Sequence, residues 1–311
     1  MHGLPITGAA LLHSLARLGV FASLAAMAGA WAFHWLVLRP ALSGWAIPAE
    51  WTERAERRVA RQGFVAACVL VLAAVGRLVA QMLEFLVPGE SVIEALRFIV
   101  LDTTWGSAWV AQVALGGLAL GAFRTARAQG TTAWSAAGLI TLLACITPAF
   151  SGHAASVERW RAVAIVSDSA HVVAGGTWIG ALLALLIVSS VQADGGASRR
   201  DVLLQLLARF SPLALASAAV LAGTGTVAGL LHIPTLADLF GSTYGRVLLV
   251  KLAFVASVAG VGFHHWRRAM PALEAGGPPH AFAKTIRVEL ILAFAVLAIT
   301  ALLTASPLPG D

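Results

Sequence analysis

The residues of this chain that could do chemistry are above all its histidines. Its 311 residues include nine His, four Met and two Cys. Neutral imidazole is the commonest protein ligand for metals. It suits Cu, Zn, Fe and Ni, whereas thiolate and thioether groups select Cu(I). Asp168 and His171 lie three residues apart, so on a helix they share one face, where the carboxylate can orient the ring or bind the same metal. The residue types therefore predict a transition-metal or haem site.

Further candidate ligands come from other segments of the chain. The segment 151–153, Ser-Gly-His, follows Pro148 at the end of an apolar run, and a histidine on a glycine-flanked loop can move toward neighbouring helices. His13 enters from the first apolar run at a depth similar to that of His171. The predicted outer metal site comprises His171, His153, His13, Asp168 and His2, with Met82 on the same side and able to line it.

Three cations also fall inside apolar runs. Arg17, Arg77 and Lys251 each lie about nine residues from the outer end of their run, which is the end predicted below to face away from the cytoplasm. Because a helix rises about 1.5 Å per residue, the three cations lie at one common depth. Ionisable residues inside a membrane are costly and mark functional or paired positions. Glu84 shares a helical face with Arg77, and Asp102 and Asp168 are further available partners. We expect these cations either to be neutralised by carboxylates or to limit the passage of a metal cation.

The elements that must position these residues are membrane-spanning helices. Hydrophobic residues make up 59% of the chain and charged residues 12%, with a mean hydropathy of +0.84, whereas soluble proteins have roughly 45–50% apolar and about 25% charged residues. This composition excludes a soluble enzyme, a disordered chain and a disulfide scaffold. A bilayer core takes about 20 apolar residues as helix. The predicted spans cover 8–38, 62–86, 105–123, 132–150, 162–190, 207–231, 245–265 and 286–304.

The predicted fold is therefore all-α, a polytopic transmembrane helical bundle of about eight spans. We expect a single transmembrane domain over residues 1–311, with no soluble domain. No cationic region precedes the first apolar run, so we expect no cleaved signal peptide. Small residues spaced by four let helices approach closely. Such contacts are predicted at Gly117–Gly121, Gly176–Gly180 and Gly225–Gly229.

Basic residues predict the orientation of the bundle. The formal net charge is +6, and the loop 39–61 alone holds five arginines. The loops predicted on the other side hold only Arg97, Arg159, Arg161 and Arg246. Cytoplasmic loops are rich in Lys and Arg, so both termini are expected outside, in the periplasm of a Gram-negative cell. The sequence has no basic stripe with interleaved aromatics, so we expect no nucleic-acid partner.

Motifs of the common enzyme classes are absent from the sequence. There is no GxxxxGK[ST] phosphate loop and no HExxH zinc motif. A GxSxG nucleophile elbow is also missing. We therefore expect a binding or transport protein, with no catalytic activity.

Several stretches resemble one family. The segment 168–180, DSAHVVAGGTWIG, resembles the signature of the bacterial copper-resistance protein D family (CopD). The segments 243–246 and 264–271, together with Lys251 and the Arg-Val-Glu of 287–289, agree with it. The resemblance extends over the whole chain, with eight spans in the expected order.

The resemblance implies a multi-pass protein of the bacterial inner membrane that moves a copper ion from the periplasm to the cytoplasm. It implies copper, as Cu⁺ or Cu²⁺, as the bound ion. It also implies a separate periplasmic copper-binding protein of the CopC type as partner, beside membrane lipid. Carried over by position, it points to Asp168, His171 and Trp178 as site residues. Lys251, Arg287 and Glu289 would be structural or coupling residues.

Three alternatives remain at this point. The first is a membrane cytochrome b, with one haem held between His13 and His171 and its propionates held by the buried cations. The second is an assembly factor that delivers copper without transporting it. The third is a protein that senses or stores copper.

Overall fold

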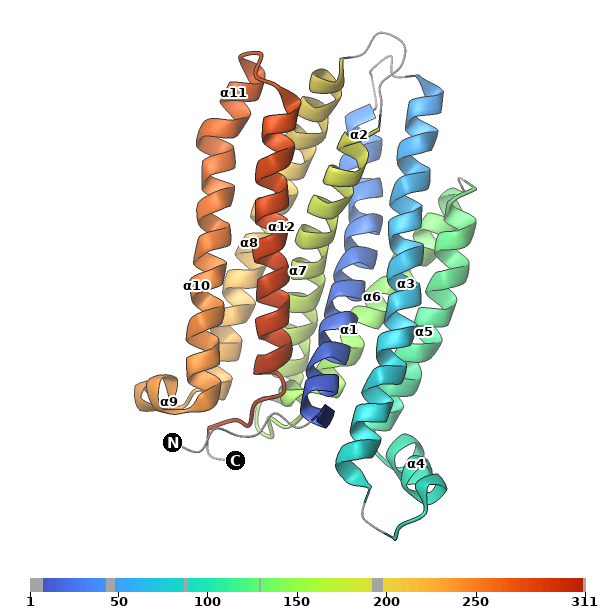
Figure 1. The fold of residues 1–311 in the computed structure, drawn as a ribbon, viewed down its shortest axis with the longest axis vertical. Helices are drawn as coiled ribbons and strands as arrows, with labels where there is room; N and C mark the ends of the chain where they lie inside the picture. The colour runs from blue at the N-terminus through green and yellow to red at the C-terminus, as the bar shows by residue number, and fades with distance from the viewer. Residues whose placement is uncertain (1–7, 43–47, 87–88, 129, 192–197, 310–311) are drawn as a thin grey trace.

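The computed structural model describes residues 8–42, 48–86, 89–128, 130–191 and 198–309, and every regular element within these ranges is a helix. Eight segments of this part of the chain are long and apolar enough to cross a membrane, which confirms the predicted all-α bundle (Figure 1). Their main helices are α1 (Gly8–Ala32), α3 (Ala49–Phe85), α5 (Thr104–Ala126), α6 (Thr131–Phe150), α7 (Arg161–Ser189), α8 (Arg199–His232), α10 (Thr243–His264) and α12 (Pro279–Leu303).

Shorter helical elements extend or connect these spans. The helix α1 continues through a π-helical turn, η1 (Phe33–Leu38), into α2 (Arg39–Leu42). In the same way α10 continues through the π-helical η3 (His265–Ala269) into α11 (Met270–Glu274). The short connecting helices are α4 (Val92–Leu101), the 3₁₀ turn η2 (His153–Ala155) and α9 (Leu236–Gly241).

Three spans begin earlier than their apolar runs predict. The helix α3 already begins at Ala49, α8 at Arg199 and α12 at Pro279, whereas the apolar runs begin at 62, 207 and 286. The early turns are held by charged residues, for example the pair of Arg57 with Glu53 at 3.1 Å, four residues apart. These helices therefore extend beyond the apolar runs that predicted them.

The helix α1 begins and α12 finishes at the same end of the bundle, beside the short helices α4 and α9 (Figure 1). We call this the terminal end and the other the opposite end. In the orientation predicted from the basic residues, the terminal end faces the periplasm.

The core lies where α1 packs against α3 and α7. At this crossing, a Cβ added to Gly180 of α7 would lie 1.9 Å from the carbonyl oxygen of Ala25, so only glycine fits. Gln62 of α3 closes the crossing, since its side-chain amide donates to the carbonyls of Ala26 (2.9 Å) and Gly180 (3.0 Å). The predicted close contact at Gly176–Gly180 is confirmed, with Gly176 also against α1.

The other two glycine pairs do not bring two helix backbones close together. A Cβ added to Gly117, Gly121 or Gly229 would meet nothing within 4 Å, and at Gly225 only the His171 ring, at 3.8 Å. These predictions were wrong because spacing alone does not show whether a small face is turned toward another helix or toward lipid. Gly117 and Gly121 lie on an exposed face of α5.

The helices α8 and α10 lie at the periphery. In the most apolar part of each, only 6% of the residues are buried, compared with 67% in the span that contains α1. The helix α8 packs mainly on α7, and α10 mainly on α12. Their exposed faces carry large apolar side chains such as Leu215, Leu230 and Leu252, as expected of surfaces that contact lipid.

Candidate functional site

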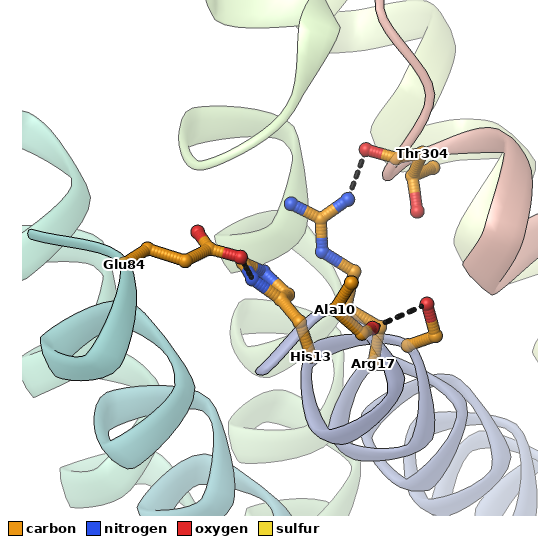
Figure 2. Close-up of polar contacts among 6 residues, drawn as sticks. Ala10, His13, Arg17, Glu84 and Thr304 are labelled. Carbon is orange, nitrogen blue, oxygen red and sulfur yellow. Dashed lines mark hydrogen bonds and ion pairs between the residues drawn. The ribbon is translucent and has the colours of Figure 1, made fainter. Parts of the chain in front are cut away.

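Two clusters of polar side chains lie inside the bundle toward its terminal end. The first, which we call the arginine cluster, consists of His13 and Arg17 of α1, Arg77 and Glu84 of α3, and Gln112 of α5. Figure 2 shows part of it: Nδ1 of His13 lies 3.2 Å from a carboxylate oxygen of Glu84, and Arg17 donates to the backbone carbonyl of Thr304. The cluster thus ties α1 to α3 and to the end of α12.

Arg77 is the buried centre of the arginine cluster, with 5% of its surface exposed. Its guanidinium donates to the Gln112 side chain (3.4 Å) and to the Ser151 hydroxyl (3.2 Å), and it lies 5.4 Å from the centre of the Trp105 ring. Gln112 in turn donates to Thr147 of α6 at 2.9 Å. These partners are amide, hydroxyl and aromatic groups, which are neutral. None of them is a carboxylate that would balance the positive charge of Arg77.

The second cluster joins α7, α8 and α10. This histidine cluster consists of His153 of η2, Asp168 and His171 of α7, His232 of α8, and Tyr244 and Lys251 of α10. The rings of His153 and His232 lie 6.1 Å apart, centre to centre. Tyr244 lies 5.9 Å from His153 and 6.3 Å from His232, so the three rings form a triangle.

The charges of the histidine cluster lie deeper than the triangle of rings. The carboxylate of Asp168 interacts electrostatically with Lys251 and with His232. Lys251 also acts on His171, whose Nδ1 lies 2.8 Å from the hydroxyl of Thr224. The Thr224 hydroxyl donates its own hydrogen to the carbonyl of Val220 at 2.7 Å. The hydroxyl oxygen therefore accepts from His171 Nδ1–H, which leaves the ring's Nε2 as its lone-pair nitrogen.

Local structure explains why the three rings meet. The turn that carries His153 is held by a small apolar cluster of Ala149, Ala154 and Ala164, against which Leu231 of α8 packs. Leu231 directly precedes His232, the last residue of α8. The chain then turns through α9, which begins with a capping box between Thr235 and Asp238, and α10 brings Tyr244 back in its first turn.

The opposite end of the bundle holds two more His–Glu pairs. In η3, Nδ1 of His265 lies 2.8 Å from a carboxylate oxygen of Glu289, which is 4% exposed. In η1, His34 lies 3.7 Å from Glu56 and stacks on Trp134, with ring centres 3.9 Å apart. Both histidines lie in π-helical turns, which occur often at functional sites.

The residues predicted for the metal site are divided between the two clusters. His171, His153 and Asp168 belong to the histidine cluster, whereas His13 belongs to the arginine cluster. His2 lies outside the described residues. Among the residues that the structure describes, no group of three or more His, Cys, Asp and Glu side chains is placed to hold a metal ion.

The remaining predicted residues have other surroundings. Trp178 of α7 is partly buried and packs against the hydrophobic core. Met82 of α3 is also partly buried. Of the charged residues, Lys251 interacts electrostatically with the carboxylate of Asp168, and Arg17 with that of Glu84.

Two residues of the histidine cluster were missed by the sequence reasoning. His232 directly follows the predicted span 207–231 and is not among the predicted ligands. Tyr244 lies in the family-like segment 243–246 and is not among the predicted site residues. A signal existed for both, because each flanks the short loop between two apolar runs on the predicted outer side. No sequence spacing relates them to His153, which lies nearly 80 residues earlier than His232.

The haem alternative required His13 and His171 to face one another. In the structure the ring of His13 is bonded to Glu84 of α3, and that of His171 to Thr224 of α8. The two histidines thus have Nδ1 partners on different helices and belong to different clusters, and the haem alternative stays a prediction.

Comparison with known proteins gives the family. The profile described as "Copper resistance protein D-like, N-terminal domain" matches residues 8–163, half of the chain, and the profile described as "Copper resistance protein D" matches residues 204–303. A curated relative, the copper transport protein CutJ of Bacillus subtilis (strain 168), is 28% identical over 220 residues. The match covers 70% of this chain and 39% of the relative. No solved structure matches the chain significantly. The chain is thus a multi-pass membrane protein that belongs to the copper resistance protein D family.

Proposed function

We propose that this protein binds copper at the histidine cluster and moves it across the inner membrane toward the cytoplasm. The observation that carries the proposal is the histidine cluster near one end of a bundle of this family. Its His153 and His232 rings lie 6.1 Å apart, and Asp168 interacts electrostatically with His232 and Lys251. Imidazole suits copper, and ionisable groups inside a membrane mark ion pathways. The direction follows from the orientation that the basic residues predict.

The charge of the histidine cluster fits a cationic cargo. Lys251 alone would repel a copper ion, because two positive charges at close range in a low dielectric are costly. The carboxylate of Asp168 interacts electrostatically with Lys251 and offsets that charge. A cluster balanced in this way accepts a cation with less repulsion than a lone lysine would cause.

The arginine cluster has the opposite character. It holds two arginines, Arg17 and Arg77, but a single carboxylate, that of Glu84. This excess of positive charge disfavours the passage of copper between α1, α3 and α5. We therefore place the copper route along α7, α8, α10 and α12, and assign the arginine cluster a structural role that couples to transport through His13.

The opposite end of this route offers a second histidine. His265 lies where α10 gives way to η3, beside Glu289 of α12. A carboxylate only accepts, so His265 Nδ1 donates and Nε2 carries the lone pair, the arrangement of a carboxylate-oriented metal ligand. We assign His265 the role of releasing copper on the cytoplasmic side, with Glu289 as its orienting group.

The proposed partners are a periplasmic copper-binding protein of the CopC type and membrane lipid. The first rests on the family to which the chain belongs, and the chain spans 39% of the length of the relative CutJ. Lipid would cover the exposed apolar faces of α8 and α10.

Copper uptake into proteoliposomes tests the proposal. The purified full chain is reconstituted with a copper-sensitive dye in the lumen, and Cu⁺ is added outside under a reductant. We expect wild-type vesicles to fill with copper and His171→Ala vesicles to fill much more slowly. His280→Ala, an exposed histidine at the other end of the bundle, is the matched control and should behave as wild type. If copper binds to the protein but never reaches the lumen, the transport proposal is wrong, and delivery or sensing of copper would be the better account.

A further inference from the structure

The side chain of His232 is prepared to bind a metal through one defined nitrogen. Its Nδ1 lies 2.8 Å from the backbone carbonyl oxygen of Ala228. A carbonyl can only accept, so Nδ1 must carry the hydrogen and Nε2 must carry the lone pair. Nε2 is buried and has no hydrogen-bond partner among the residues that the structure describes. A histidine whose Nδ1–H is held by a backbone carbonyl is the usual form of a metal ligand.

The distance to His153 indicates how a metal would be shared. A metal–nitrogen bond of about 2.0 Å, with about 1.1 Å more from nitrogen to ring centre, places two imidazole centres about 6.2 Å apart when both face one metal in a straight line. At a tetrahedral angle the same bonds bring the centres to about 5 Å. The observed separation of 6.1 Å agrees with the straight arrangement.

The surroundings of the pair favour low coordination. The described part of the chain offers no third His, Cys, Asp or Glu side chain placed to complete a metal site here. Tyr244, which is 7% exposed, packs beside both rings and closes that side with an aromatic wall. Asp168 interacts electrostatically with His232, so a carboxylate lies near any positive charge bound there.

Two-coordinate, linear binding by imidazole is a property of the d¹⁰ ion Cu⁺. Zn²⁺ prefers four ligands in a tetrahedron, and Cu²⁺ prefers tetragonal sites of nitrogen and oxygen. From these observations we propose that His153 and His232 form a two-coordinate Cu⁺ site, with His232 Nε2 as one ligand. The site deepens the proposed function: it rests on copper as the cargo and adds the oxidation state and the first two ligands that the ion meets.

Binding of Cu⁺ to the detergent-purified full chain tests the site. Affinity is measured anaerobically by competition with a coloured Cu⁺ chelator, and the coordination of the bound ion by X-ray absorption at the copper edge. The expected spectrum shows two nitrogen ligands with imidazole scattering and the intense edge feature of linear Cu⁺. A spectrum that shows three or four ligands would overturn the proposal. This measurement uses the wild-type chain, so it does not depend on a variant that could fail to fold.

The variants are His153→Ala and His232→Asn. Asparagine can still donate to the Ala228 carbonyl from a position close to that of Nδ1, but it has no counterpart of Nε2, so the helix end is preserved while the ligand is lost. We expect each variant to weaken Cu⁺ binding by more than the about 10- to 100-fold that the loss of an outer-shell partner costs. His264→Ala, an exposed histidine at the opposite end, should leave the affinity unchanged. Unchanged affinity in His232→Asn would overturn the assignment.

These outcomes can be separated from failure of the proposed function. If the spectrum shows bis-imidazole Cu⁺ but proteoliposomes take up no copper, the site stands and transport falls. If uptake proceeds at the wild-type rate in both His153→Ala and His232→Asn, transport stands and the site falls.

Discussion

Arg77 of α3 donates a hydrogen bond to the hydroxyl of Ser151 at 3.2 Å, and Ser151 lies two residues before His153. The arginine cluster therefore holds the start of the turn that carries a proposed copper ligand. Since Arg77 is buried and also bonded to Gln112, this anchor links α3 and α5 to the histidine cluster without contacting the metal. We therefore assign Arg77 the role of a positioning residue.

Replacement of Arg77 by lysine should weaken copper binding without removing a ligand. Lysine keeps the charge but cannot reach both Gln112 and Ser151 with one planar group. We expect Cu⁺ affinity to fall by about tenfold, the lower end of what outer-shell changes cost, in a chelator competition assay. Arg57→Lys, at an exposed position, is the control. An unaltered affinity in Arg77→Lys would show that the 151–153 turn holds its place without this anchor.

The contact between Thr224 and His171 should control the rate of transport. Thr224→Val removes the hydroxyl that accepts from His171 Nδ1–H but keeps the shape of the side chain. The ring then loses its fixed orientation, and we expect uptake into proteoliposomes to slow by about 10- to 100-fold. Thr226→Val, whose hydroxyl bonds within its own helix, should have no effect. Equal rates in the two variants would argue against a role for His171 in the copper route.

The charges of Asp168 and Lys251 should act on copper in opposite directions. Lys251→Met removes a positive charge and should raise the affinity for Cu⁺, whereas Asp168→Asn leaves Lys251 unbalanced and should lower it, each by about tenfold, or about 1.4 kcal/mol. The double variant should return close to the wild-type value, which a chelator competition titration of all four proteins measures. Changes of the same sign in both single variants would refute the balance of charge.

The fold could be predicted from the sequence much further than the site. Eight apolar runs and the backbone's need for internal hydrogen bonds in lipid predict a helical bundle. The described part of the chain contains eight helices long and apolar enough to cross a membrane. The spacing of Asp168 and His171 also places both correctly on one helix, α7. Helix ends were less predictable. The first turns of α3 are rich in charged residues, so their low hydropathy predicts a loop although they are helical.

The grouping of the histidines required the structure. Depth in the membrane can be read from a sequence, and on that basis His13 and His171 appeared equivalent. The order of helices around the bundle cannot be read in the same way, and it separates the two, with His13 beside Glu84 and His171 beside Thr224. His232 and Tyr244 join the site through loop and cap geometry, for which no periodic pattern exists.

The crossing of α1 and α7 should tolerate no side chain at Gly180. In Gly180→Ala the new Cβ would collide with the backbone of Ala25, so the two helices must separate and the core loses its packing. We expect a strong loss of monodisperse protein and a lower melting temperature in detergent. Fluorescence-detected size-exclusion chromatography after heating measures both quantities. Gly121→Ala, where nothing lies within 4 Å, should be neutral or slightly stabilising, since alanine favours helix by about 1 kcal/mol. Similar melting temperatures for both variants would contradict the close crossing.

The His265–Glu289 pair should affect release of copper without affecting its capture. Glu289→Gln leaves the side-chain shape but weakens the bond that orients His265. We expect the Cu⁺ affinity of the histidine cluster to stay at the wild-type value while luminal uptake slows by about tenfold or more. A parallel fall in affinity and rate would mean that this end acts on the whole bundle, rather than on release.

The number of copper and iron atoms per chain tests the central claim most directly. The full chain is purified in detergent after growth with both metals, and the two elements are counted by mass spectrometry in the wild type and in the double variant His153→Ala/His232→Asn. The account predicts about one copper ion per chain for one two-ligand site, no iron, and loss of copper in the double variant. Iron near one atom per chain, or copper that the double variant retains in full, would contradict it.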